Sequence, residues 1–376
     1  MPGKILLIGL GELGYHILTQ LSLTKNVGKI VAADVKDEAK IKAIIARNTA
    51  FHRGLYPEIE FIKIDLFDVK GTAETLKEIK PDVICNATVL QSWWVFHLLP
   101  EKIVEKLNDA GLGPQLPFHL TLTYKLMQAV KLSGIETRVI NCSYSDVVDP
   151  VLGKVGLAPV CGGGNMDLVV PLIKELVSKE TGTPVQNVSV YMFGHHGLLS
   201  SFMHAPFLVK IYVYDKDVTD RFPHDKIREY CQPYLKALMS GGTRWRVPPN
   251  EDIAASFTRN LLAVYFDTKE LCHAQGPAGL PGGYPVRLSA RGAEVVLPEG
   301  VTIDEAVRIN EECGRYDGIE KIKDDGTVVF TEKAVKVYRE VLGYECEELK
   351  IEESEERAKE LAGLFKKLLE KCGIHY

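Results

Sequence analysis

The sequence lacks the features of membrane, secreted and nucleic-acid-binding proteins. Its eight cysteines contain no Cys-x-x-Cys pair, which favours reduced thiols in a cytoplasmic protein over a disulfide framework or a zinc site. The uncharged stretch 83–100 is too short and too polar to cross a membrane, and the N-terminus has no export-signal pattern. The 45 Lys and Arg residues nearly balance the 50 Asp and Glu residues, so nucleic acid and membrane surfaces are not expected partners.

A chain of 376 residues with 46% hydrophobic and 25% charged residues is long enough for roughly two globular domains. In its first half, short apolar runs alternate with helical patterns, which predicts βαβ units. We therefore expect an α/β protein with an N-terminal Rossmann domain, a doubly wound parallel sheet, over 1–150. Its predicted strands are 4–8, 29–33, 60–64, 83–85 and 138–141.

The pattern changes after residue 150, where helices and β-branched runs predict an α+β domain over 151–345. The Gly- and Pro-rich stretch 276–285 should be a loop. A helical extension is expected over 346–376, with Leu361, Leu364, Phe365 and Leu368 at helical spacing. This apolar stripe favours a surface or subunit-docking helix, and a homo-oligomer, dimer or tetramer, is the expected assembly.

The first predicted strand leads directly into Gly9-Leu10-Gly11-Glu12-Leu13-Gly14, a G-x-G-x-x-G motif at the start of a helix. The first glycine makes the tight turn, the second lets backbone approach a pyrophosphate, and the third allows close packing of helix on strand. The helix N-terminus presents free N–H groups to the phosphates. We expect a dinucleotide to bind here.

Asp34 lies twenty residues after Gly14, at the end of the second strand, where a carboxylate would bind the adenosine ribose. Because a carboxylate there repels the extra phosphate of NADP, NAD is the expected cofactor. Asn86-Ala87-Thr88 and Asn141 end the fourth and fifth strands, at the edge where the nicotinamide should lie. The two asparagines could equally be ordinary turn residues.

A candidate for proton transfer is the segment Gly194-His195-His196-Gly197, which follows a β-branched run. Hydride transfer to or from a carbonyl carbon needs a group that moves a proton, and histidine suits this role when a carboxylate holds its ring. His195 is a second candidate for the same role.

At these residues the chain resembles the lactate/malate dehydrogenase family. The family has a glycine-rich Asn-Leu-Asp segment opening a long helix, then a strand, then Gly-Glu-His-Gly; this chain has Gly164-Asn165-Met166-Asp167 and later Gly194-His195-His196-Gly197. The resemblance implies that His196 is the catalytic acid/base, that Asp167 orients it, and that Asn141 touches substrate and nicotinamide. It runs from residue 9 to about residue 197 and fades beyond.

The departures from the family concern its substrate-binding arginines. The family has an Arg three residues after the orienting Asp, where this chain has Val170, and Arg138 is its single Arg between residues 54 and 220. Valine cannot bind a carboxylate bidentately, so a simple 2-hydroxy acid is not the expected substrate. Trp93, Trp94 and His97 replace the family's mobile loop and could wall a pocket for a larger substrate, although core packing is the plainer role for the two tryptophans.

Three interpretations stay open. The leading one is an NAD-dependent oxidoreductase acting on a small-molecule hydroxyl or carbonyl compound; the others are a hydrolase, lyase or epimerase that uses NAD as a recycled internal oxidant, and a non-catalytic NAD-sensing protein. No metal is expected, because His195, His196 and His204 lack metal-ligand spacing. The sequence does not identify the cation that replaces the missing arginine; the candidates are Lys102, Lys106, Lys125 and Arg259.

Overall fold

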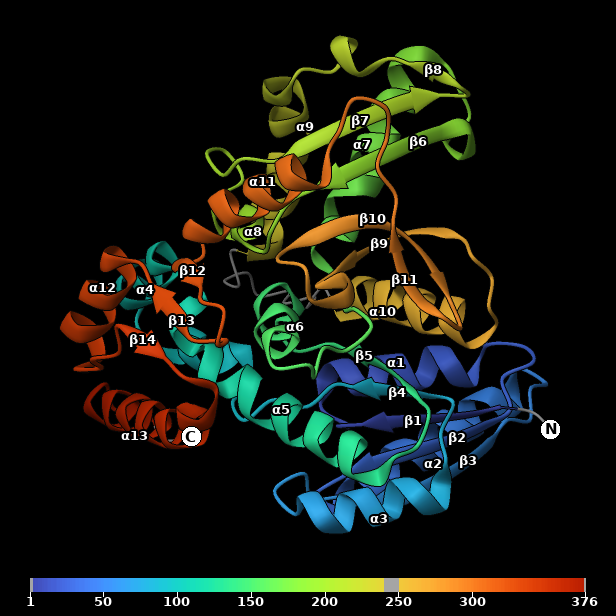
Figure 1. The fold of residues 1–376 in the computed structure, drawn as a ribbon, viewed down its shortest axis with the longest axis vertical. Coiled ribbons are helices and arrows are strands. Elements are labelled where there is room, and N and C mark those ends of the chain that lie inside the picture. Colours follow the sequence, from blue (N-terminus) through green and yellow to red (C-terminus); the bar gives the residue numbers. More distant parts are fainter. Residues whose placement is uncertain (1–2, 240–249, 375–376) are drawn as a thin grey trace.

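The computed structural model describes residues 3–239 and 250–374. Its N-terminal part contains a parallel sheet with strand order β3-β2-β1-β4-β5 (Figure 1). The order reverses direction between β1 and β4, as in doubly wound sheets, and this confirms the predicted Rossmann-like α/β fold. The strands are β1 (Lys4–Ile8), β2 (Lys29–Asp34), β3 (Glu58–Lys63), β4 (Val83–Asn86) and β5 (Arg138–Asn141).

Both faces of the sheet are buried. Successive residues of its central strand point to opposite faces, and on each face they pack against helices. Leu6 and Ile8 join the core on the side of α3 and α5. Ile5 and Leu7 join the core on the side of α1, α2 and the later helix α10. These helices are α1 (Glu12–Ser22), α2 (Lys40–His52), α3 (Val69–Ile79), α5 (Leu116–Ser133) and α10 (Asn250–Tyr265).

The second half contains two small antiparallel sheets, as the α+β prediction requires. One sheet packs against α7 (Asn165–Thr181) and α9 (His224–Met239), and the other lies beside α10 (Figure 1). The first is formed by β6 (Val188–Phe193), β7 (Leu208–Val213) and β8 (Lys216–Asp217); the second by β9 (Leu271–Gln275), β10 (Gly283–Ser289) and β11 (Gly292–Val295).

The C-terminal part returns to the N-terminal domain. After α11 (Ile303–Arg315), it forms a third antiparallel sheet and two helices that pack against α4 (Glu101–Ala110) and α5 (Figure 1). Phe365 is fully buried and its ring lies 6.3 Å from that of Phe118 on α5. The elements of this part are β12 (Ile319–Ile322), β13 (Val328–Phe330), α12 (Glu332–Leu342), β14 (Glu348–Leu349) and α13 (Ser354–Lys371).

Several predicted segments differ in detail from the structure. Helix α6 (Ser145–Lys154) runs across the predicted boundary at 150, and β14 pairs with β13, which joins residues 348–349 to the domain expected to end at 345. The loop expected over 276–285 ends early, because β10 starts at Gly283. The tail stripe has a role within the chain: Leu361 and Phe365 are buried in the core beside α5. No helix among residues 3–239 and 250–374 is long and apolar enough to cross a lipid bilayer.

The packing of α13 predicts a large effect of truncating Phe365. We expect Phe365→Ala to lower the free energy of unfolding by about 3–5 kcal/mol, since it removes a buried aromatic ring and leaves a cavity. Lys366→Ala, which alters an exposed neighbour on the same helix, is the matched control and should leave it nearly unchanged. Urea denaturation followed by far-UV circular dichroism measures both; an equal midpoint for the two variants would contradict this packing.

Candidate active site

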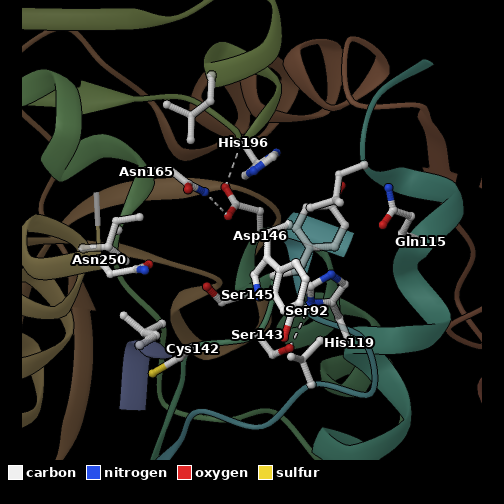
Figure 2. A pocket seen from close by; sticks show the side chains of 18 of the residues that line it. Ser92, Gln115, His119, Cys142, Ser143, Ser145, Asp146, Asn165, His196 and Asn250 are labelled. Carbon is white, nitrogen blue, oxygen red and sulfur yellow. Dashed lines mark hydrogen bonds between the residues drawn. The ribbon is translucent and has the colours of Figure 1, made fainter. Parts of the chain in front are cut away.

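A cavity of about 360 Å³ lies at the carboxyl ends of β1, β4 and β5. Loops from both halves of the molecule line it, including the glycine loop after β1, residues 142–146 after β5, His196 after β6 and Asp317 after α11 (Figure 2). In a doubly wound sheet this edge, where the strand order reverses, is the usual place for a ligand. The predicted cofactor residues in the lining are Gly11, Glu12, Leu13, Ala87 and Thr88.

The glycines of the loop have the backbone geometry that the motif requires. Gly9 has φ of +92°, which disfavours any other residue. A Cβ on Gly14 would lie only 1.9 Å from the carbonyl oxygen of Gly9, so the strand and helix can pack this closely only with glycine. At Gly11, in contrast, an added Cβ would meet no heavy atom within 4 Å, so the backbone here faces open space at the cavity.

Asp34 lies beside the glycine loop. Its Oδ2 accepts a hydrogen bond from the backbone N–H of Leu10 at 2.7 Å, and its Oδ1 accepts one from that of Lys36 at 2.9 Å. The carboxylate therefore stands at the end of β2, next to the turn that would hold a pyrophosphate, as the motif predicts.

Asn86 and Asn141 are fully buried below the cavity and are not part of its lining. The amide nitrogen of Asn86 donates to Asn141 Oδ1 at 3.2 Å, and that of Asn141 donates to Asp149 Oδ1 at 2.7 Å. The backbone N–H of Ser143 also donates to Asn141 Oδ1. The amide of Asn141 thus holds the loop after β5, and the contact of Asn141 with substrate and nicotinamide stays a prediction.

His196 is paired with a carboxylate that the sequence did not indicate. Its Nδ1 donates to Asp317 Oδ2 at 2.8 Å, and the hydroxyl of Tyr144 donates to the same oxygen at 2.5 Å. The side chain of Asp317 has no exposed area, while that of His196 is 21% exposed. Both residues line the cavity, and the buried Asp317 carboxylate holds the partly exposed His196 imidazole in place.

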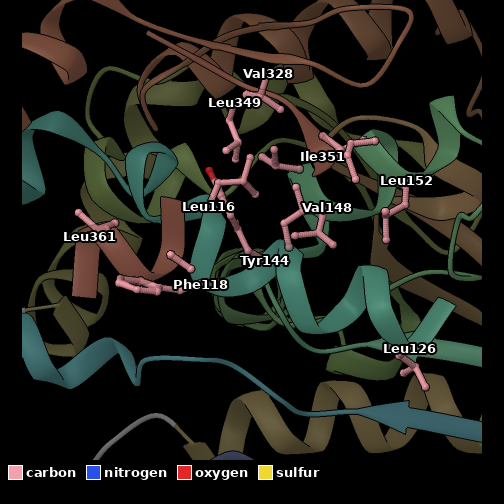
Figure 3. Packing of buried hydrophobic residues seen from close by; sticks show 14 of the residues in the cluster. Leu116, Phe118, Leu126, Tyr144, Val148, Leu152, Val328, Leu349, Ile351 and Leu361 are labelled. Atoms are coloured by element: carbon pink, nitrogen blue, oxygen red, sulfur yellow. The ribbon is translucent and has the colours of Figure 1, made fainter. Parts of the chain in front are cut away.

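Tyr144 connects this pair to the hydrophobic core. Its ring lies in the same buried cluster as Leu116 and Val148 (Figure 3). Its hydroxyl donates a hydrogen bond to Asp317. The ring also makes edge contacts with His119 and His196. His119 Nδ1 in turn lies 3.0 Å from the hydroxyl oxygen of Ser143. The ring of Tyr144 thus lies between the His196–Asp317 pair and the His119–Ser143 pair, and all of these residues line the cavity.

Burial and the Asp317 charge act in opposite directions on the protonation of this network. Burial opposes the charged form of His196, but the charge and hydrogen bond of Asp317 outweigh it and raise the pKa of the imidazole. Burial alone would raise the pKa of Asp317, yet the imidazole holds it well below its usual range. His195, which burial dominates, has its pKa lowered to about 4. Each partner of the His196–Asp317 pair thus favours the charged form of the other.

A second carboxyl group, Asp146, lies next to His196 (Figure 2). It stands in the first turn of α6, accepts the backbone N–H of His196 at 3.0 Å and accepts the Asn165 amide at 2.5 Å. Burial raises its pKa to about 7, with the His196 charge opposing the rise. Asp146 can therefore carry or release a proton near neutral pH. Sequence reasoning missed it, although its place after the end of β5 was a usable signal.

Asp167 does not contact His196, and the predicted pairing of these two residues is wrong. Its Oδ2 accepts hydrogen bonds from Arg259 Nη2 at 2.7 Å and from the Ser256 hydroxyl at 2.5 Å, both on α10. The guanidinium of Arg259 neutralises this carboxylate and ties α7 to α10. Val170, three residues further on, is buried in the core around α7.

The other predicted site residues are divided between the cavity and its surroundings. Trp94 and His97, from the short turn Trp93–Leu98, line the cavity, while the side chain of Trp93 lies outside the part that the structure describes. His195 is buried and its Nδ1 lies 3.9 Å from Asp317 Oδ2. Within 3–239 and 250–374, no three His, Cys, Asp or Glu side chains, His204 included, are grouped to hold a metal ion.

None of the four cations considered as replacements for the missing arginine belongs to the described lining of the cavity. Arg259 pairs with Asp167, and Lys125 pairs with Glu355 at 2.8 Å. Lys102 and Lys106 are exposed on α4, and the described part of the lining contains no Lys or Arg. The imidazoles and carboxyl groups of the described lining are those of His97, His119, His196, Glu12, Asp146 and Asp317.

Comparison with solved structures supports this architecture. No family model and no curated protein sequence matches the chain. The malate dehydrogenase of Plasmodium falciparum in complex with NADH superposes with a TM-score of 0.56 at 16% identity, covering 89% of this chain and 98% of that one. The fold is that of malate and lactate dehydrogenases.

Two further structures give the same result. The lactate dehydrogenase of Cryptosporidium parvum, complexed with lactic acid and nicotinamide adenine dinucleotide, has a TM-score of 0.59 at 16% identity and covers 84% of this chain and 96% of that one. The malate dehydrogenase of Picrophilus torridus has a TM-score of 0.57 at 17% identity over 84% of this chain and 97% of that one. The resemblance found in the sequence motifs therefore extends to the fold of nearly the whole chain.

The Asp167–Arg259 pair predicts an asymmetric effect on stability. We expect Arg259→Ala to lower the free energy of unfolding by about 2–4 kcal/mol, because it leaves a buried carboxylate without its counter-charge. Asp167→Asn combined with Arg259→Ala should recover part of that loss, since no charge is then stranded. Urea titration of the two variants measures this difference; a double variant less stable than Arg259→Ala alone would contradict the pairing.

Proposed function

We propose that the protein is an NAD-dependent oxidoreductase that interconverts a hydroxyl and a carbonyl group of a small molecule. The observation that carries this proposal is that the glycine loop after β1 and the His196–Asp317 pair line one continuous cavity. A dinucleotide site and a proton-exchanging group are the two parts that hydride transfer between a cofactor and a substrate requires.

The residues present fit a bound dinucleotide. Gly11 leaves backbone facing open space, and the first turn of α1 offers N–H groups to a pyrophosphate. Asp34 stands where it would accept hydrogen bonds from the adenosine ribose, which favours NAD over NADP. The solved structures of similar fold include complexes with NADH and with nicotinamide adenine dinucleotide. When bound, NAD would supply the acceptor for hydride.

The chain itself would move the proton. With Nδ1 donating to Asp317, His196 keeps Nε2 as the ring nitrogen that exchanges a proton with a substrate oxygen. Neutral His196 takes the proton of a hydroxyl group during oxidation, and the imidazolium returns it to a carbonyl oxygen during reduction. Asp317 stabilises the imidazolium and fixes the ring, the role that the sequence had given to Asp167.

The substrate is proposed to differ from a simple 2-hydroxy acid. The position of the family's carboxylate-binding arginine is Val170, a core residue here, and the described lining offers carboxyl and hydroxyl groups in place of a guanidinium. Trp94 and His97 would contact the part of the substrate remote from the reacting carbon. A cytoplasmic location and a homo-oligomeric state, dimer or tetramer, remain part of the proposal. The eight free cysteines support the cytoplasmic location.

The variant His196→Asn tests the proton role. We expect it to lower turnover by at least ~10²-fold, because the general acid/base is lost, and to leave NADH affinity nearly unchanged. Turnover is followed at the nicotinamide absorbance band with a substrate found by screening secondary alcohols, polyols and 2-hydroxy acids. His204→Asn, an exposed histidine outside the lining, is the control. Equal turnover in the two variants would remove the assignment.

The variant Asp317→Asn tests the ion pair without any substrate. The Asp317 charge raises the pKa of His196, so its removal should lower that pKa and leave the imidazole neutral at a pH where the native ring is charged. In the oxidation direction, where neutral His196 is needed, the acid limb of the rate profile would move to lower pH. NMR titration of the His196 ring, assigned with His196→Asn, measures the shift; an unchanged or higher pKa would refute the pairing.

One observation favours a second candidate function, in which NAD is a recycled internal oxidant for elimination, hydrolysis or epimerisation. Asp146 places another proton-exchanging group next to His196, and such reactions need a second acid or base at a neighbouring carbon. The stoichiometry of NADH separates the two candidates. A simple oxidoreductase releases one NADH per substrate oxidised, whereas an internal oxidant leaves none.

A further inference from the structure

Two thiols meet at the floor of the cavity. Cys85, on β4, and Cys142, directly after β5, have their Sγ atoms 3.5 Å apart. The two strands are neighbours in the sheet, and the backbone N–H of Cys142 donates to the Asn86 carbonyl at 2.8 Å, which fixes the two chains side by side. A disulfide needs the sulfurs at about 2 Å, so closure requires a movement of only about 1.5 Å.

The two thiols differ in their exposure. Cys142 lines the cavity and is half-buried, so a small oxidant that enters the cavity reaches it. Cys85 is fully buried and lies outside the lining, so it is protected until its neighbour reacts. A second thiol directly behind an accessible one can resolve its sulfenic acid to a disulfide, and this pair has that geometry. Burial raises the pKa of the Cys142 thiol, so the reaction should be faster in alkaline solution, where more thiolate is present.

We propose that Cys142 is a site of oxidative modification and that Cys85 resolves it to a disulfide. A peroxide oxidises the Cys142 thiol to a sulfenic acid and is itself reduced to water or an alcohol. The Cys85 sulfur then attacks the sulfenic sulfur, the S–O bond breaks, and a second water leaves with the proton of the Cys85 thiol. Two thiols have lost two electrons in total, which the peroxide has accepted, and a dithiol reductant reverses the change.

The modification would act on the candidate active site. Cys142 is followed by Tyr144, which donates to Asp317, and by Asp146, which accepts the backbone N–H of His196. Cys142 and Ser143 also line the same cavity as Gly11 and Ala87 of the proposed cofactor site. Pulling Cys142 toward β4 displaces this stretch of the lining, so we expect oxidation to raise the Kd for NADH by about tenfold, the effect of losing about one hydrogen bond. This consequence rests on the proposed function, whereas the formation of the disulfide does not.

The test treats the full chain with hydrogen peroxide and maps its peptides by mass spectrometry without reduction. We expect a single new cross-link between Cys85 and Cys142 that a dithiol removes. Cys85→Ala should form no cross-link and instead accumulate sulfenic or sulfinic acid at Cys142. Cys161→Ala, which alters a buried cysteine near Cys142 without an Sγ contact to it, is the matched control and should cross-link as the native chain does.

Several outcomes would overturn the proposal. Cross-linking of Cys142 to any other cysteine, or equal rates of sulfinic acid formation in the native chain and in Cys85→Ala, would show that Cys85 is not the resolving thiol. NADH titration of the reduced and oxidised chain tests the coupling, and an unchanged Kd would refute it. If the reduced chain does not bind NADH, the proposed function fails, while the peptide map still decides the thiol pair.

Discussion

The site depends on the buried carboxylate of Asp317, which joins three parts of the chain. Oδ2 holds the His196 ring and the Tyr144 hydroxyl, and Oδ1 accepts the backbone N–H of Leu112 at 3.0 Å. Its backbone carbonyl accepts the N–H of Gly113 at 2.7 Å. A buried carboxylate without hydrogen-bond donors is costly. Both carboxylate oxygens and the backbone carbonyl oxygen of Asp317 accordingly accept hydrogen bonds.

The glycine at position 111 shows how closely the surrounding chain packs on this residue. Gly111 has φ of +80°, and a Cβ there would lie 2.3 Å from the carbonyl carbon of Asp317. The loop between α4 and α5 thus packs so closely on the Asp317 backbone that there is no room for a side chain at position 111. The position of the His196–Asp317 pair is thus set by packing between the N-terminal domain and the C-terminal part.

The sequence predicts those features that are encoded locally. The strands, the glycine turn and the place of His196 after a strand follow from short patterns, and the structure agrees with the fold that they indicate. The pairing of Asp317 with His196 and of Arg259 with Asp167 could not be predicted in this way, since the partners lie 121 and 92 residues apart. Asp167 was assigned wrongly because its motif fits the family, while the competing guanidinium comes from another helix.

The changes around α7 form one set. Val170 is a core residue and Asp167 is paired with Arg259, so neither presents a free charge to the cavity. The carboxylate that holds the His196 imidazole comes instead from Asp317, after α11.

The late position of Asp317 in the chain has a consequence for biosynthesis. A growing polypeptide that has left the ribosome only as far as α10 already contains the glycine turn and His196, but it lacks the counter-charge for the imidazole and the helices that cover α4 and α5. The N-terminal sheet with its glycine turn can be assembled early in translation, whereas the His196–Asp317 pair is completed only when the last sixth of the chain has emerged and docked.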